Sequence, residues 1–459
     1  MPDPSRVLAG LGVAMAVLFL VPAGVLWGLG WMRGRAACDQ FDYHIKAILE
    51  FASELPRPDL RNYASATTPG YHLLMAAVER ATGAGALGLQ VGASVFTLGL
   101  LGLCGWLIGR AGTLRGWRWW ELAALGLPIV ASPYVFTSGV WLLPDNAGWL
   151  LVVAVLAASG AFVGTHWRGA WSVGIGCVLL VLTVLVRQSH LWVAAPFVTA
   201  AWLSPTGEDE GCLASALRAP GGRIGMTSAA GFACVPAVAV LGWFAALWHG
   251  LTPPSFQGQH EHGVNATTPV FFLALVGVFS PFFVAWWWPG MVRLWRGARW
   301  ATFGAAALGL AAGALPETTY LYEPRASGLW QVVRAMESRG IAYIGGRTSI
   351  LIIVLATIGA PMLAAWLAIV EGKRRWIIGC AIAAFVASQC ANANCWQRYH
   401  EPLILILFAL MAAGSARPER EPGTIRFVRW AGPVALGALL VAVLVYGLLT
   451  GRDPTLPNP

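Results

Sequence analysis

The polar residues most suited to chemistry lie in residues 38–44, Cys-Asp-Gln-Phe-Asp-Tyr-His, between two apolar stretches. A carboxylate such as Asp39 or Asp42 can act as a general base, taking the proton from a hydroxyl as that hydroxyl attacks. The two acids are three residues apart, so on an α-helix they share a face. Either acid is therefore a candidate catalytic base, and His44 is a candidate for binding substrate.

A second polar stretch follows within the same segment. Thr67 and Thr68 begin the sequence Thr-Thr-Pro-Gly-Tyr71. Only 11% of the residues are charged, and a chain crossing lipid keeps polar groups where it lines a cavity or leaves the bilayer. We therefore interpret residues 32–71 as an active-site loop, with both threonines as substrate-binding candidates. The alternative is that the acids of this segment have no catalytic role and only keep an exposed loop soluble.

Two motifs place charge at the ends of apolar runs. Asp145 lies in Leu-Pro-Asp-Asn-Ala-Gly148, and Arg187 and Gln188 lie in Val-Arg-Gln-Ser-His-Leu-Trp192. An arginine with short flanks inside a membrane protein pairs with an acid or holds an anion. Arg187 could pair with Asp145, bind substrate, or do both.

Two later motifs add histidines and an arginine. His260 and His262 form a His-x-His pair that could bind a metal, but no further ligands are apparent nearby, so we expect no metal site and favour hydrogen bonds to a phosphate or sugar. Arg398 and His400, in Trp-Gln-Arg-Tyr-His400, precede another apolar run. They suit a lipid-linked phosphate, or alternatively anchor the chain at the membrane surface. Arg187, His260 or His262, and Arg398 are our candidates for holding a phosphate.

The elements that position these residues are membrane helices. The 459 residues are 57% hydrophobic, which excludes an ordinary soluble domain. A span needs about 20 apolar residues, and about thirteen stretches qualify or come close, which predicts an all-α polytopic protein with about 11–13 transmembrane helices. We expect one integral membrane domain covering residues 1–459.

Basic residues indicate how these spans are oriented. If the spans alternate, short loops rich in arginine and lysine fall on one side, and such loops stay cytoplasmic. They include residues 110–118, 293–299, 373–375 and 417–429. The opposite side then carries residues 32–71, 250–267, 317–346 and 390–399, where most candidate site residues lie. This topology accounts for the net charge of +9, so we do not expect nucleic-acid binding.

The loop at 317–346 has a further feature. Apolar Leu329, Val332, Val333 and Met336 recur at helical spacing, which predicts an amphipathic helix on the outer surface. Cys390 and Cys395 could form a disulfide in an oxidising compartment or remain free.

In this order the motifs resemble the endoplasmic-reticulum dolichyl-phosphoglucose α-1,2-glucosyltransferases, which are multi-spanning GT-C glycosyltransferases. Residues 39–44 and 67–71 resemble the family's Asp-Glu-x-Phe-His and Thr-Thr-x-Pro-Gly-Leu-Tyr motifs. Residues 144–148 are similar to its Tyr-Thr-Asp-x-Gly segment, residues 186–192 to Phe-Arg-Gln-Thr-Asn, and residues 396–400 roughly to Asn-Arg-His-Tyr. Residues 258–262 match the Gly-Asp-Lys/Arg-x-x-His loop only loosely. One extra residue separates Asp39 from His44, so either Asp39 or Asp42 could be the family's acid.

The resemblance implies a GT-C-type helix bundle that transfers a hexose, with glucose as the first candidate, from a polyprenyl-phosphate sugar. No other cofactor is implied. The acceptor would be a lipid-linked or envelope glycan, and inversion would occur at the anomeric carbon. Composition and short loops favour a bacterial cytoplasmic membrane with the site on its periplasmic face.

Other functions are open at this point. A secondary transporter could use Asp145 and Arg187 for substrate and protons, although such proteins usually contain internal repeats, which are not found here. A GT-C enzyme that transfers mannose or a pentose would have much the same sequence features.

Overall fold

The computed structural model describes residues 4–162, 170–204, 221–260, 263–316, 318, 328–337, 343–344, 348–418 and 422–455. Its elements in the first half are α1 (Pro4–Gly28), α2 (Arg35–Asp39), the π-helix η1 (Gln40–His44), α3 (Ile45–Glu54), α4 (Gly70–Thr82), α5 (Gly85–Leu114), α6 (Trp119–Ala131), α7 (Pro133–Val140), α8 (Asp145–Ala158), α9 (Ala170–Val186), the 3-10 helix η2 (Gln188–Val193) and α10 (Ala194–Leu203). The second half contains α12 (Gly221–Trp248), α13 (Pro254–His260), α14 (Thr267–Phe279), η3 (Ser280–Phe283), α15 (Val284–Ala314), α16 (Leu329–Glu337), β1 (Tyr343–Ile344), β2 (Thr348–Ser349), α17 (Ile350–Ile369), α18 (Gly372–Gln389), α19 (Gln397–Gly414) and α20 (Gly423–Thr450).

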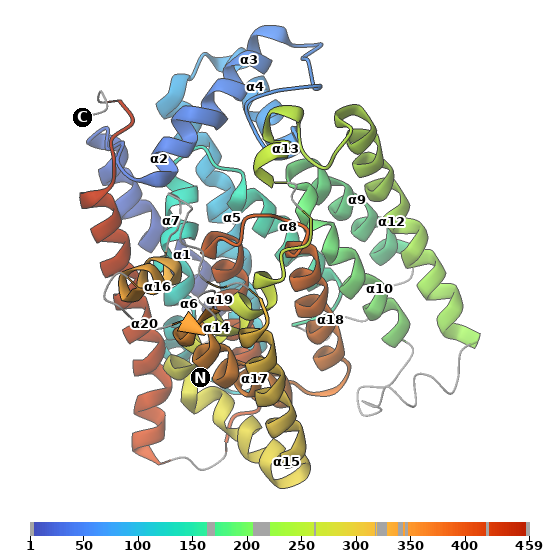
Figure 1. Cartoon of the computed structure of the whole chain (residues 1–459), viewed down its shortest axis with the longest axis vertical. Helices are drawn as coiled ribbons and strands as arrows, with labels where there is room; N and C mark the ends of the chain where they lie inside the picture. Colours follow the sequence, from blue (N-terminus) through green and yellow to red (C-terminus); the bar gives the residue numbers. More distant parts are fainter. Residues whose placement is uncertain are drawn as a thin grey trace.

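The described chain is an all-α bundle (Figure 1), and its only strands are the two-residue pair β1 and β2. Six helical stretches in the described part are long and apolar enough to cross a membrane, or seven if α6 and α7, bent by 63°, count as one span. The predicted all-α, multi-pass membrane architecture is confirmed. The expected number of spans, about eleven to thirteen, is larger because it includes short helices such as α8 and α10 that fall below the length of a full span.

One long helical stretch doubles back on itself. Residues 267–314 form a continuous run of 48 residues, but Ala298 has non-helical backbone angles. Gly290 lies against Ala365 near the end of α17, whereas Gly313 lies against Ile353 near its start. The chain therefore reverses between these glycines, at the lower end of Figure 1. Since glycine has no side chain, both segments pack closely on the backbone of α17.

The basic connections meet at one end of the bundle. Arg115 forms an ion pair with Glu371 at 2.7 Å, and Arg417 approaches Glu121 at 3.7 Å. These contacts join segments far apart in the sequence, and they bring together loops that the sequence assigned to the cytoplasmic side.

The polar segments meet at the opposite end, where α3, α4 and α13 lie in Figure 1. The Gly34 N–H donates to the Arg452 carbonyl at 3.0 Å, the Trp248 indole donates to the Leu60 carbonyl at 2.8 Å, and the Asn265 N–H donates to the Cys390 carbonyl at 2.7 Å. Cys390 and Cys395 are free thiols. Residues 32–71, here called the first loop, therefore pack directly against residues from the second half of the chain.

The predicted amphipathic helix is present as α16, although most of the surrounding 317–346 loop lies outside the described residues. Trp330 donates to the Cys395 carbonyl at 2.7 Å and stacks on Phe271 with ring centroids 4.4 Å apart. Val332 is 49% exposed, so it does not share the buried face that its spacing predicted. The helix is fixed to the bundle through Trp330.

Candidate active site

The first acid motif adopts a π-helical turn. Helix α2 ends at Asp39 and continues directly into η1, Gln40–His44. In a π-helix the hydrogen bonds join residues five apart, so Asp39 and His44 come onto one face, and both line the same cavity. Asp42 is exposed and does not line that cavity. The expected α-helix across Asp39 and Asp42 is wrong, because Asp42 lies in this π-helical turn. Both acids line a second, larger cavity, but only Asp39 also lines this one.

Two cavities meet at this turn. The smaller cavity has a volume of about 550 Å³ and the larger cavity about 1330 Å³. Five residues line both: Asp39, Tyr43, Asp145, Trp396 and Arg398. These side chains form the wall that the two cavities share.

The shared wall contains two buried ion pairs. The Arg398 guanidinium donates to the Asp39 carboxylate at 2.5 Å, and Arg187 donates to Asp145. The Asp39 and Asp145 side chains are each 12% exposed. Asp145 begins α8, where the N-terminal helix dipole favours a negative charge. The Arg187–Asp145 pair considered from the sequence is confirmed.

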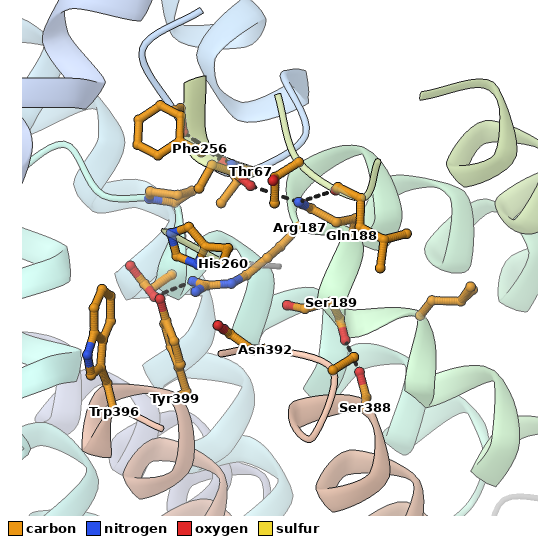
Figure 2. A pocket seen from close by; sticks show the side chains of 18 of the residues that line it. Thr67, Arg187, Gln188, Ser189, Phe256, His260, Ser388, Asn392, Trp396 and Tyr399 are labelled. Carbon is orange, nitrogen blue, oxygen red and sulfur yellow. Dashed lines mark hydrogen bonds and ion pairs between the residues drawn. The ribbon is translucent and has the colours of Figure 1, made fainter. Parts of the chain in front are cut away.

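Both arginines lie against the ring of Tyr399, and Figure 2 shows Tyr399 beside Arg187. The Arg187 Cζ atom is 4.8 Å from the centre of the Tyr399 ring, and the Arg398 Cζ atom is 5.2 Å from it. The Arg398 Nε atom is buried and has no acceptor among the described residues. Two guanidiniums on one aromatic ring, with an unused charged donor, are suited to binding an anion such as a phosphate.

Gln188 holds the Thr67–Thr68 turn against the site. Its side-chain oxygen accepts from the Thr68 N–H at 2.9 Å, and its amide donates to the carbonyls of Ala66 at 2.8 Å and Leu251 at 3.1 Å. Thr67 lines the smaller cavity, whereas Thr68 is fully buried and donates to the Val184 carbonyl. Gln188 and Thr68 therefore position the turn, and only Thr67 of the two threonines faces the cavity.

His260, at the end of α13, also lines the smaller cavity. Its ring centre lies 6.1 Å from that of Trp396, and Figure 2 shows it above Arg187 and Tyr399. The structure thus brings Arg187, His260 and Arg398, three of the expected phosphate ligands, to one cavity. His262 lies outside the described residues.

His44 is coupled to a second histidine that the sequence analysis did not select. The Nδ1 atom of His44 lies 2.9 Å from the Nε2 atom of His72, which is fully buried. Burial lowers the pKa of His44 to about 4 and also lowers the pKa of His72 well below its ordinary value. Both rings are therefore neutral at neutral pH, and one of them donates its single ring N–H to the other.

No protein-family model matches the chain, and no curated protein matches it.

His400 does not take part in this constellation. It is fully buried in the core between Phe271 and Phe385, lines neither cavity, and its Nδ1 atom lies 3.0 Å from the Trp396 carbonyl. On helix α19 it lies two positions from Arg398, and residues two apart face different directions. Arg398 reaches the cavities, and His400 therefore cannot.

Several lining residues are not among those predicted from the sequence. Tyr43, Tyr399 and Trp396 belong to motifs that were identified, but aromatic residues at span ends usually form interfacial belts, so composition gives no reason to select them. Glu401 was also missed. It lines the larger cavity although it follows His400 directly. Its position next to Pro402 inside an apolar run was the available signal, because an acid within a membrane segment is costly unless it has a role.

Proposed function

We propose that this protein is an inverting glycosyltransferase that transfers a hexose, with glucose as the first candidate, from a polyprenyl-phosphate sugar to a lipid-linked or envelope glycan. The observation that carries the proposal is the position of Asp39. This carboxylate lies in the wall shared by two cavities and touches a guanidinium that lines both. A transfer between two substrates needs a base and an anion-binding cation where the two substrates meet.

In the proposed reaction Asp39 takes the proton from the acceptor hydroxyl while the hydroxyl oxygen forms a bond to the anomeric carbon. The bond from that carbon to the phosphate oxygen breaks, and its electron pair leaves with the polyprenyl phosphate. Because the leaving group departs as an anion, it needs positive charge rather than a proton. Arg398 supplies this charge, and Arg187, which lies against the same Tyr399 ring, adds positive charge nearby. Attack opposite the leaving group would convert a β-linked donor to an α-linked product.

Asp39 is favoured over Asp42 as the base. Asp39 is buried beside Arg398, while Asp42 is exposed and lines only the larger cavity. A base must lie within hydrogen-bond reach of the proton that it abstracts, and a position facing both cavities meets this need. The π-helical turn also supports the motif resemblance, since it accommodates the one residue by which this motif exceeds the family's motif.

The proposed location is the periplasmic face of a bacterial cytoplasmic membrane. The basic loops gather at one end of the bundle, and residues from the polar segments at the other end, such as Thr67 and Phe256, line the smaller cavity. By the positive-inside rule the basic end is cytoplasmic, which leaves Asp39 and Arg398 near the outer surface. The proposal needs no metal or organic cofactor besides the donor lipid.

A comparison by mass spectrometry of membrane lipids and envelope glycans from cells with and without the gene would test this function. We expect the sugar-carrying polyprenyl phosphate to accumulate without the gene and one glycan to lose a hexose. Purified protein in lipid nanodiscs, incubated with undecaprenyl-phosphate glucose and extracted glycolipids, should then restore the missing hexose. Unchanged lipids and glycans, together with ion-driven uptake of a small solute into proteoliposomes, would instead identify a transporter.

A further inference from the structure

The larger cavity contains a polar region that the proposed mechanism does not use. Glu401 lines this cavity and is fully buried, as is Ser132, which donates to Glu401 Oε1 at 2.6 Å. Gln397 donates to Glu401 Oε2 at 2.6 Å. Neither donor carries a charge, and no ion pair of Glu401 occurs within the described ranges.

A buried carboxyl without a cation is costly unless its hydrogen-bonding capacity is used. A carboxylate has about four lone-pair positions, and Ser132 and Gln397 occupy two of them. Glu401 therefore retains capacity to accept hydrogen bonds from a ligand in the cavity. Hydroxyl groups supply such bonds without adding charge.

Asn146 provides a second, independent observation. It is 2% exposed and lines the same cavity. Its amide nitrogen donates to Thr97 Oγ1 and to the Val135 carbonyl, but its Oδ1 atom is buried and has no donor in the described part of the chain. Leaving a buried acceptor unsatisfied typically costs about 1–3 kcal/mol, so this atom also marks a place where a ligand would donate.

Both acceptors belong to one region, at the bend between α6 and α7. The Ser132 side chain that donates to Glu401 also accepts from the Val135 N–H, and Asn146 donates to the Val135 carbonyl. Glu401 follows Arg398 by three residues on α19, which places the two side chains on neighbouring positions of one helix face. A phosphate at Arg398 would thus have a hydroxyl-binding region one helical turn away.

The remaining walls of the larger cavity suit an anionic lipid. Helix α20 contributes an apolar side through residues that include Leu436, Leu440 and Leu444. Arg33, Arg35 and Arg452 line the same cavity in addition to Arg398. Arg35 and Arg398 both lie against the Trp396 ring, at 5.2 and 4.4 Å from its centre.

We infer that the larger cavity binds the donor lipid and that Glu401 and Asn146 recognise the hydroxyl groups of its sugar. The polyprenyl chain lies along α20, the phosphate contacts Arg398, and the sugar enters the region between Glu401 and Asn146. The smaller cavity, which contains Arg187 and His260, is then left to the acceptor, and of the three expected phosphate ligands only Arg398 contacts the donor phosphate directly. This inference rests on the proposed function, since it assumes a polyprenyl-phosphate sugar as donor.

Binding to protein in nanodiscs tests the inference, with undecaprenyl phosphate and undecaprenyl-phosphate glucose as probes. The wild type should bind the glucose-carrying lipid about 10- to 100-fold more tightly, the range expected for one or two hydrogen bonds to a charged or buried acceptor. Glu401→Gln should lose most of this difference while keeping its affinity for undecaprenyl phosphate. Glu121→Gln, which alters a fully buried acid at the other end of the bundle, is the matched control and should keep the difference.

Deoxyglucose versions of the donor lipid give the same information without any substitution. At least one deoxy analogue should bind the wild type as weakly as undecaprenyl phosphate does. Tight binding of both lipids with no effect of the sugar, or an unchanged sugar preference in Glu401→Gln, would overturn the inference and leave the glycosyltransferase proposal standing. Failure of the wild type to bind either lipid would overturn the proposed function itself.

Discussion

Asp39 and Arg398 are 359 residues apart in the sequence and form an ion pair in the wall shared by the two cavities. The first loop contributes the acid and the start of α19 contributes the cation. The site is therefore assembled only when the N-terminal and C-terminal parts of the chain pack together. Because Asp39 forms this pair and Asp42 does not, substitutions of the two acids should have different effects.

Asp39→Asn should reduce turnover by about 10²–10⁴-fold, the usual cost of removing a general base. The amide is nearly isosteric and can still contact Arg398, so donor binding should be retained. Asp42→Asn is the matched control and should keep most activity, because Asp42 is exposed and lies outside the shared wall. Steady-state transfer and lipid binding would be measured on both. If the Asp39→Asn variant is fully active, Asp39 is not the general base.

The Arg187–Asp145 pair should contribute to folding as well as to binding. Asp145→Asn or Arg187→Gln alone leaves a largely buried charge without its partner, which typically costs about 3–5 kcal/mol. The double variant should lose less than the sum of the two, with a coupling of about 0.5–3 kcal/mol. Thermal or denaturant unfolding in detergent would provide the four values of the cycle. Additive losses would mean that the contact carries no net interaction.

Gln188 should stabilise the Thr67–Thr68 turn through its three hydrogen bonds. Gln188→Glu keeps an acceptor for the Thr68 N–H but cannot donate to the Ala66 and Leu251 carbonyls, whereas Gln188→Ala loses all three hydrogen bonds. We expect a loss of about 1–3 kcal/mol for Gln188→Ala. Limited proteolysis between residues 57 and 66 should be faster in both variants, and fastest in Gln188→Ala. Equal cleavage rates in the wild type and both variants would show that Gln188 does not hold this turn in place.

The features that could be predicted from the sequence are those that depend on local residue patterns. Hydropathy identified the helices, and an arginine beside an apolar run identified Arg187 and its partner Asp145. The π-helical turn at Gln40–His44 could not be predicted, since residue types do not distinguish it from an α-helix. His400 was misjudged because helix phase depends on which face of α19 meets the core. The Asp39–Arg398 pair and the His44–His72 pair are tertiary contacts, and no single motif specifies them.

The His44–His72 pair predicts a pH dependence of stability. The pKa of His44 is about 4 in the folded protein because of burial. Burial and, to a smaller extent, the neighbouring His44 lower the pKa of His72, while an unfolded histidine titrates near pH ~6.5. Asp39, Asp145, Arg187 and Arg398 also act on His44. Between pH ~6.5 and pH ~4 the unfolded chain binds protons that the folded chain does not, so the free energy of unfolding falls as the pH is lowered.

Melting temperatures across this pH window would measure the effect. The double variant His44→Asn, His72→Asn should have a flatter profile than the wild type, although it is less stable at neutral pH. His249→Asn, which alters an exposed histidine, is the control and should keep the wild-type slope. If the melting temperature of the double variant depends on pH as steeply as that of the wild type, groups other than these two histidines cause the loss of stability at acidic pH.

The membrane orientation can be tested with single cysteines in a cysteine-free background. Ser53 is exposed in α3, at the polar end of the bundle, and Gly297 is exposed at the reversal of α15, with open space around its Cα atom. If the basic end is cytoplasmic, Ser53→Cys should react with a membrane-impermeant maleimide in intact spheroplasts. Gly297→Cys should react only after the membrane is permeabilised. The reverse pattern would place Asp39 and Arg398 on the cytoplasmic side, where the proposed periplasmic transfer could not occur.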